Sequence, residues 1–291
     1  MSRMERVVVV MRSACDLRGP LETASWISRV SGASLTVMVR PGFRGGCRAV
    51  EIRFRELEVP SASRRVITSS GKLNKSVSHE LAHVHGAQLV VAGAMECGPD
   101  SAELLDPETV EFIEAISQPV LLFPFRRVPA LPWSSIVTPM SGEIRRNRAL
   151  SRAIELANQL HVPIDIIHVL DPAQPELHGA LSVGKFGDQA HHELHAMIDE
   201  FISDACPYCS KSEKRVIRNF HLVHGKATEE LLKVLSGSAV GLLAIEWKGS
   251  FMEGHAETLK TLIRRLRIPV LLVRQSPASE VQLRAGHRLA A

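Results

Sequence analysis

The chain has few aromatic residues, little net charge and no long apolar run. Aromatic residues make up 4% of its 291 residues, and the net charge is only +4. A nucleic-acid binder usually combines a concentrated basic patch with stacking aromatic side chains, so the composition argues against that class. No apolar run approaches the roughly 18–20 residues that cross a bilayer, so membrane association would require a partner protein.

Cysteine is also scarce. The five cysteines form an odd set, whereas a secreted disulfide framework normally uses an even number. The start of the chain shows no secretory signal pattern. Both features predict a reducing, cytoplasmic location.

An internal repeat organises the chain. Pro119-Val120-Leu121-Leu122 recurs 150 residues later as Pro269-Val270-Leu271-Leu272. Each copy is a short apolar run behind a proline, which is typical of a buried parallel strand. Three further landmarks match in the same order: Val7–Met11 with Ile136–Met140, Leu35–Val39 with Ile164–His168, and Gly71-Lys72 with Gly225-Lys226. The sequence therefore predicts a duplication, with about 25 residues lost from the first copy or gained by the second.

The repeat and the prolines divide the chain. Residues 1–124 form a degenerate first domain, 125–132 a proline-rich linker, 133–274 a second domain, and 275–291 a mobile tail. Prolines at 124, 129 and 132 predict a short, fairly stiff connection. A hydrophobic content of 45% is enough for two cores of ordinary domain size.

Apolar runs alternate with amphipathic segments in both halves. The expected strands are 6–11, 34–40, 65–69, 88–92, the run behind Pro119, 135–139, 164–170, 215–223, 239–245 and the run behind Pro269. The expected helices are 20–30, 74–85, 107–117, 141–160 with Ser141 as N-cap, 188–205, 228–235 and 257–266, while 41–63 indicates a truncated helix or an irregular loop. Such alternation requires parallel sheets with right-handed crossovers. The predicted fold class is α/β, with two tandem open parallel-sheet domains (Rossmann-like α/β/α sandwiches) packed as a pseudo-dimer.

This order of elements resembles the universal stress protein family in its tandem two-domain form. The second half carries the clearer match, in Ile136-Val137-Thr138-Pro139, Ile167-His168-Val169, His224–Leu231 and Ile268–Val273. In the first half, residues 87–93 and 118–122 match best. The resemblance implies a stress-response regulator rather than an enzyme. It also implies that the strands behind Pro119 and Pro269 pair with each other.

The family has an ATP-binding branch, from which this chain departs. That branch places an Asp after the first strand and a G-x-x-G loop with a later G-S or G-T after the fourth, where backbone amides bind phosphate. Here Met140 and Ser141 follow the first strand of the second half, and Gly249 and Gly254 have a different spacing. In the first half, the acidic residues at 100–108 would repel phosphate. Any ATP site is therefore expected in the second half only.

If the second half holds a nucleotide, six residues at the strand ends are its candidate contacts: Pro139, Met140, Ser141, Val169, Gly249 and Gly254. Ordinary strand-to-helix turn chemistry is the alternative interpretation of these residues. The sequence has no Ser-His-Asp order, no paired carboxylates with a cleft and no P-loop. It therefore predicts no catalytic set, with weak ATPase activity left open.

Cys206-Pro207-Tyr208-Cys209 is the sharpest local motif, and it resembles a glutaredoxin active site. There the pair opens a helix, which lowers the pKa of the first thiol, whereas here it follows a helix and meets the opposite end of the dipole. Zinc held by Cys206 and Cys209 with His191, His192 or His195 is a second interpretation. Since His195 and Cys206 lie about 16 Å apart along one intact helix, the helix would have to fold back or a second subunit contribute. A structural role is the third interpretation.

Three hypotheses for function follow. The preferred one is a non-enzymatic stress-response regulator that acts through protein partners or a bound small ligand. The alternatives are an ATP- or adenine-nucleotide-binding module in the second domain and a zinc or thiol-redox sensor built on Cys206 and Cys209. Whether two chains form a homodimer is left open.

Overall fold

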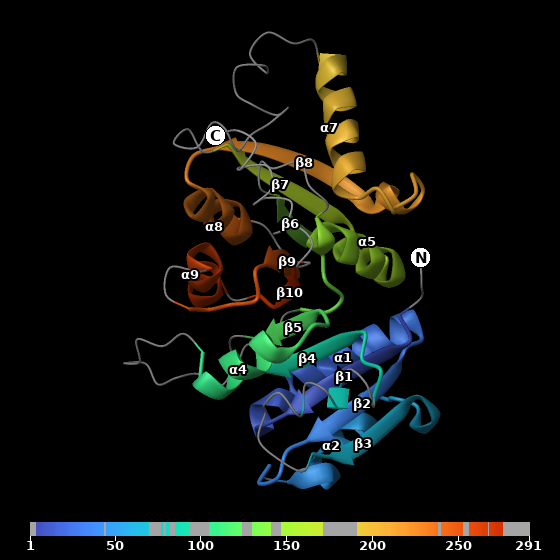
Figure 1. Cartoon of the computed structure of the whole chain (residues 1–291). Helices are drawn as coiled ribbons and strands as arrows, with labels where there is room; N and C mark the ends of the chain where they lie inside the picture. Colours follow the sequence, from blue (N-terminus) through green and yellow to red (C-terminus); the bar gives the residue numbers. More distant parts are fainter. Residues whose placement is uncertain are drawn as a thin grey trace.

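The computed structural model of the chain describes residues 4–43, 45–69, 77, 80–81, 85–93, 105–123, 130–140, 147–170, 191–237, 240–252, 256–266 and 268–275. These residues form a single sheet of ten strands in the order β3-β2-β1-β4-β5-β10-β9-β6-β7-β8 (Figure 1). Each half contributes five parallel strands, and the two halves use the same internal order. This confirms the predicted fold class.

The first half carries strands β1 to β5. They are β1 (Arg6–Met11), β2 (Ser34–Val39), β3 (Arg64–Thr68), β4 (Leu89–Gly93) and β5 (Val120–Phe123), with helices α1 (Gly19–Ser31), α2 (Gly46–Glu56) and α4 (Pro107–Ala115). The segment that indicated either a helix or a loop forms α2, which buries Val50 and Phe54, one turn apart, against the sheet. The helix predicted at 74–85 falls largely outside the described residues.

The second half repeats the arrangement. Its strands are β6 (Ile136–Met140), β7 (Ile164–Leu170), β8 (Ile217–His224), β9 (Leu242–Trp247) and β10 (Val270–Arg274), and its helices are α5 (Arg148–Leu160), α7 (His191–Ala205), α8 (Ala227–Gly237) and α9 (Glu257–Arg265). Among the described residues, no helix combines the length and the apolar character needed to cross a membrane. Residues 124–129, which include most of the predicted linker (125–132), and all but the first residue of the predicted tail (275–291) lie outside the described residues, so the domain boundaries stay predictions.

Helix α5 begins later than predicted. Its N-cap is Asn147, whose side-chain oxygen accepts a hydrogen bond from the Leu150 amide at 2.8 Å. The backbone of Asn147 is extended, so the helix cannot run through it from Ser141. The prediction of Ser141 as N-cap is therefore wrong, and Ser141 itself lies outside the described residues. The buried residues of α5 start at Ala149, directly after its first residue, Arg148, which agrees with a helix that starts after Asn147.

The two halves meet along β5 and β10. These strands pair antiparallel, with Leu121 opposite Leu271, which confirms the predicted pairing. On one face of the sheet, Trp26 of α1 and Trp133, just before β6, meet edge to face with ring centroids 5.0 Å apart. The junction therefore joins both backbones and side chains of the two halves.

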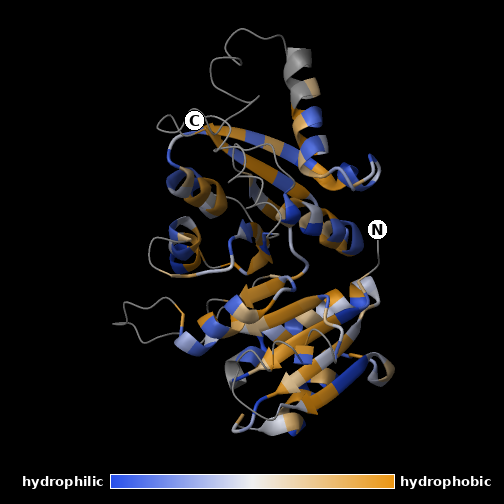
Figure 2. Ribbon diagram, viewed as in Figure 1, coloured by the Kyte–Doolittle hydropathy of each residue, from blue (hydrophilic) through white to orange (hydrophobic). Residues whose placement is uncertain are grey.

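Hydrophobic cores lie on both faces of the sheet. Alternate residues of β1 point to opposite faces, so Val7 and Val9 join one core while Val8 and Val10 join the other. Figure 2 shows the strands as the most hydrophobic parts of the molecule. Each core contains residues of both halves, so the sheet and its two apolar layers run without a break across the junction.

Candidate functional site

Open α/β sheets bind ligands in the crevice at the carboxyl ends of the strands, where the strand order reverses. In this chain the reversal falls between β1 and β4 in the first half and between β6 and β9 in the second. The two crevices are equivalent in topology, but they differ in their side chains.

The first crevice is filled by Arg12, the residue that follows β1. Its side chain is only 1% exposed. The guanidinium donates to the carbonyl oxygen of Gly93 at the end of β4 and to the Thr109 hydroxyl at 2.6 Å, and it pairs with the Asp106 carboxylate at 3.3 Å. Arg12 thus ties the ends of two strands to the first turn of α4.

The Asp106 carboxylate is held in its charged form. Burial raises its pKa, but hydrogen bonds from Thr109 and the charge of Arg12 outweigh burial and hold the pKa below its usual value. Asp106 is also the N-cap of α4. The acidic segment that was expected to repel phosphate is therefore partly neutralised, because Asp106 pairs with Arg12, and Glu108 with Arg40 at 2.9 Å.

Asp16 completes the closure of the first crevice. It lies in a single 3-10 turn (Ala14–Leu17) and accepts hydrogen bonds from the amides of Arg12 and Ser13 at 2.7 and 2.8 Å. Burial raises the pKa of Asp16 despite these bonds. A side chain at Gly93 would collide with the Asp16 carboxylate, so the glycine is required for this close approach. The crevice is packed with protein groups.

The second crevice opens earlier along its strands. Strands β6 and β9 pair only at Ile136 and Val137, whereas β1 and β4 stay paired over four residues. Pro139 has no backbone N–H to donate, which is consistent with a ladder that ends just before it. Strand β6 remains paired with β7 through Met140. The second crevice therefore differs from the first in that its two central strands, β6 and β9, separate after Val137.

A carboxylate stands at the N-terminus of α5, beside this opening. Glu246 of β9 accepts a hydrogen bond from the Arg148 amide at 3.3 Å, and burial raises the pKa of Glu246. The Arg148 side chain donates to the carbonyl oxygen of Arg274 at 3.0 Å. A helix N-terminus attracts anions, and here a residue of the chain already takes part of that position.

The loop after β9 turns toward the first half of the chain. Gly249 has φ of +86°, and a side chain there would collide with the Arg274 guanidinium. Arg274 donates to the carbonyl oxygens of Gly249, at 3.0 Å, and of Glu114 in α4. The Glu114 carboxylate in turn accepts from the Phe251 amide at 2.6 Å. Both halves therefore hold this loop.

The structure places four of the six candidate nucleotide contacts. Pro139 and Met140 end β6, and the Met140 carbonyl oxygen lies 3.2 Å from Nδ1 of buried His168 on β7. Val169 is the next residue of β7. Gly249 instead contacts Arg274 of β10, on the other side of β9. Ser141 and Gly254 lie outside the described residues, so the complete set stays a prediction.

The cysteine motif lies at the C-terminal end of α7. Cys206 is buried in the core, and its sulfur accepts a hydrogen bond from the Ser151 hydroxyl of α5 at 3.4 Å. Cys209 is half-buried. Among the described residues, no cluster of three or more His, Cys, Asp or Glu could hold a metal ion. The side chains of His191, His192 and His195 lie outside the description, so the zinc interpretation stays a prediction.

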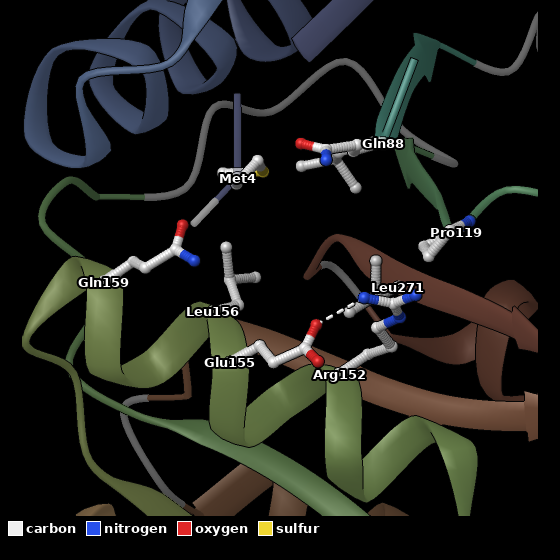
Figure 3. A pocket seen from close by; sticks show the side chains of 9 residues that line it. Met4, Gln88, Pro119, Arg152, Glu155, Leu156, Gln159 and Leu271 are labelled. Carbon is white, nitrogen blue, oxygen red and sulfur yellow. Dashed lines mark hydrogen bonds and ion pairs between the residues drawn. The ribbon is translucent and has the colours of Figure 1, made fainter. Parts of the chain in front are cut away.

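A second hollow, a pocket between the two halves, lies at the amino ends of the strands, opposite the crevices at their carboxyl ends (Figure 3). Met4, Gln88 and Pro119 precede β1, β4 and β5, and they face Leu271 and a polar rim from α5, where Arg152 and Glu155 form an ion pair at 2.5 Å. Its volume is about 50 Å³. Ligand pockets usually measure about 300–1,000 Å³, so this one has room for waters rather than for a nucleotide.

The interactions of four residues were missed at the sequence level: Arg12, Asp106, Glu246 and Arg274. Asp106 was noted only as part of the acidic segment at 100–108. Each has its partner far away in the chain, as Arg12 and Asp106 are 94 residues apart and Arg148 and Glu246 are 98 apart. The available signal was the basic residue directly after β1, where the ATP-binding branch of the family has an acidic one.

The chain is therefore a tandem α/β protein, in which two open parallel-sheet units are joined through their edge strands β5 and β10. Residues 132–274 match the family model described as the Universal stress protein family. The second half of this chain belongs to the universal stress protein family. No curated protein sequence matches the chain.

Solved structures share the tandem fold over nearly the whole chain. A protein from Pseudomonas aeruginosa UCBPP-PA14 described as a universal stress protein is 16% identical, with a TM-score of 0.61 and 93% of each chain covered. A universal stress protein from Archaeoglobus fulgidus DSM 4304 is 12% identical, with a TM-score of 0.59, over 93% of this chain and 98% of that one. The cytoplasmic domain of a prokaryotic cation chloride cotransporter is 11% identical, with a TM-score of 0.53, over 92% and 95%. At these identities the likeness concerns the fold alone.

Proposed function

We propose that this chain is a non-enzymatic stress-response regulatory protein of the tandem universal stress protein type. It acts in the cytoplasm, through protein partners or a bound small ligand. Family membership of the second half supports the stress-response role. The proposal that a ligand binds in the second half rests on the contrast between the two crevices: the first is filled by Arg12, whereas the strands of the second separate early.

The first half serves as a structural domain in this proposal. A ligand entering its crevice would have to displace a guanidinium that is 1% exposed and bonded to Gly93, Asp106 and Thr109. Displacing it would leave several buried polar groups without partners, each at a cost of about 1–3 kcal/mol. Ligand binding therefore falls to the second half, where β6 and β9 part after Val137.

An adenine-nucleotide-binding module in the second half is the second candidate. The parting of β6 and β9 and the positive φ of Gly249 favour it, because glycine loops bring backbone amides close to phosphates. Glu246 opposes it, because a carboxylate at the α5 N-terminus repels phosphate when ionised. Burial raises the pKa of Glu246, so this repulsion weakens sooner than for an ordinary glutamate as the pH falls.

Native mass spectrometry with added ATP separates these candidates. If the second half binds ATP, the wild type gains the mass of one nucleotide per chain. Gly249→Ala is then expected to weaken binding about tenfold, or about 1.4 kcal/mol, because the new side chain collides with Arg274. The matched control is Gly42→Ala in the first half, since Gly42 also has positive φ, at +82°, and open space around it.

The measured mass and the rate of ATP turnover decide between the two candidate functions. A bare polypeptide mass that does not change on adding ATP rejects the nucleotide candidate and favours partner binding. Equal ATP binding by wild type and Gly249→Ala contradicts a site at the loop after β9. Steady turnover of ATP by the purified protein contradicts the non-enzymatic proposal.

A further inference from the structure

Cys206 and Cys209 close a tight turn at the end of α7. The Cys206 amide still donates to the Ile202 carbonyl oxygen at 3.0 Å, as the last step of the helix. The Cys209 amide then donates to the Cys206 carbonyl oxygen at 3.2 Å, which is the hydrogen bond of a β-turn. The ends of a β-turn lie within about 7 Å of each other, and disulfides span Cα separations of about 4.4–6.8 Å. The backbone therefore already holds the two cysteines at a distance that a disulfide can bridge.

The two sulfurs have different surroundings. Cys206 is fully buried beneath α5, where Ser151 donates to its sulfur. Cys209 is half-buried in a turn whose Pro207, Tyr208 and Ser210 are exposed, and Tyr208 is 77% exposed. A small reagent in solvent can therefore approach Cys209, while Cys206 is reached only through its neighbour.

We propose that Cys206 and Cys209 form a site of reversible thiol–disulfide exchange, with low-molecular-weight disulfides such as oxidised glutathione as the oxidant. The Cys209 thiolate attacks one sulfur of the small disulfide, forms a mixed disulfide and releases one small thiolate. Cys206 then loses its proton and attacks the Cys209 sulfur, and the second small thiolate leaves. The two protein thiols are oxidised to one disulfide, and the small disulfide is reduced to two thiols.

The pKa shifts of the two cysteines agree with the order of attack that their exposure indicates, with Cys209 first and Cys206 second. The hydrogen bond from the Cys206 thiol lowers the pKa of Cys209. The shared hydrogen bond and burial raise the pKa of Cys206. Among the charged neighbours, Lys214 favours the Cys209 thiolate, while Glu213 and Glu155 oppose it. The second cysteine of the motif is thus the attacking one, the reverse of the glutaredoxin order that the motif resembles.

The exchange site contacts the first turn of α5 directly. The Ala205 carbonyl oxygen, one residue before Cys206, accepts a hydrogen bond from the Asn147 amide at 2.9 Å. Asn147 is the N-cap of α5, and Arg148 beside it bonds to Glu246. Oxidation at the turn therefore occurs two hydrogen bonds away from the opening of the second crevice.

Incubation of the reduced, full-length protein with oxidised glutathione tests the proposal. After alkylation, trypsin releases both cysteines in one peptide, residues 186–211. We expect this peptide to lose two hydrogen masses and to escape alkylation, and dithiothreitol should reverse the change. Cys47 is the internal control, because its exposed thiol in α2 has no cysteine beside it in the sequence and should gain only a glutathione adduct.

Single substitutions test the order of attack. Cys206→Ser should trap glutathione on Cys209, because the resolving thiol is gone. Cys209→Ser should leave Cys206 many-fold less reactive, because that thiol is buried. Circular dichroism of both variants checks that they fold.

Three results would overturn the proposal, two of them on the wild type alone. One is a 186–211 peptide that keeps both thiols while Cys47 is modified. Another is stoichiometric zinc on the pair in the purified protein. The third is a glutathione adduct on Cys206 in Cys209→Ser that forms as fast as the adduct on Cys209 in Cys206→Ser, which would contradict the assigned order.

Discussion

Leu121→Ala is expected to lower the free energy of unfolding by about 2–5 kcal/mol, the usual cost of truncating a buried leucine. Leu121 is fully buried in β5, between Val91 of β4 and Leu271 of β10. The cavity would open where the two halves share one core, so the remaining side chains have little freedom to close it. Urea unfolding followed by circular dichroism measures the loss.

The control for this prediction is Ile52→Ala in α2. Ile52 is 48% exposed, so its truncation should change the free energy of unfolding by about 0.5 kcal/mol or less. The double variant Leu121→Ala with Leu271→Ala tests the pairing itself, and contacting residues should show a coupling of about 0.5–3 kcal/mol. Strict additivity of the two single losses would contradict direct packing across the junction.

Arg12→Met is expected to cost about 3 kcal/mol, the lower end of the range for a broken buried ion pair. Methionine replaces the apolar stem of Arg12 but removes the guanidinium that donates to Gly93 and Thr109 and pairs with Asp106. We take the lower end because Asp106 remains 18% exposed and water can solvate part of its charge. Urea unfolding at neutral pH measures the loss.

The cost of Arg12→Met should depend on pH. Asp106 has a lowered pKa in the folded state, so its stabilising contribution is present above the unfolded pKa and is lost as the pH falls through the folded value. The difference between wild type and Arg12→Met should therefore shrink toward acid. Arg40→Met is the matched control. Arg40, which follows β2, pairs with Glu108 of α4, the helix that Asp106 caps, and both side chains of this pair are more exposed than those of Arg12 and Asp106. Its loss should be about 1 kcal/mol or less, and a loss as large as that of Arg12→Met would contradict the argument.

Much of the fold could be predicted because parallel strands buried on both faces produce uninterrupted apolar runs. The run at 6–11 became β1 and the run at 164–170 became β7 with the predicted ends. Strand β9 was predicted at 239–245 but occupies Leu242–Trp247, because a continuous apolar run has no period that fixes its ends. The start of α5 was misplaced for a related reason, since both Ser141 and Asn147 are residue types that cap helices.

The sites could be predicted only where their residues are close in sequence. The spacing of Cys206 and Cys209 is local, so the pair was recognised before its geometry was known. The contact of Arg12 with Asp106 depends on how β1, β4 and α4 come together, and neither residue alone indicates it. In the sequence, Arg12 is a basic residue after one strand and Asp106 an acidic residue before a distant helix. Their pairing is visible only once the chain is folded.

The antiparallel contact between β5 and β10 has a consequence for how the halves associate. The two strands hold equivalent positions in the two halves, so the contact has the symmetry of an isologous dimer interface. Two separate domains would form such an interface only above their dissociation constant. Here one chain carries both domains, so each half meets the other at a high effective concentration set by the linker. The association is therefore unimolecular, and dilution does not separate the two halves.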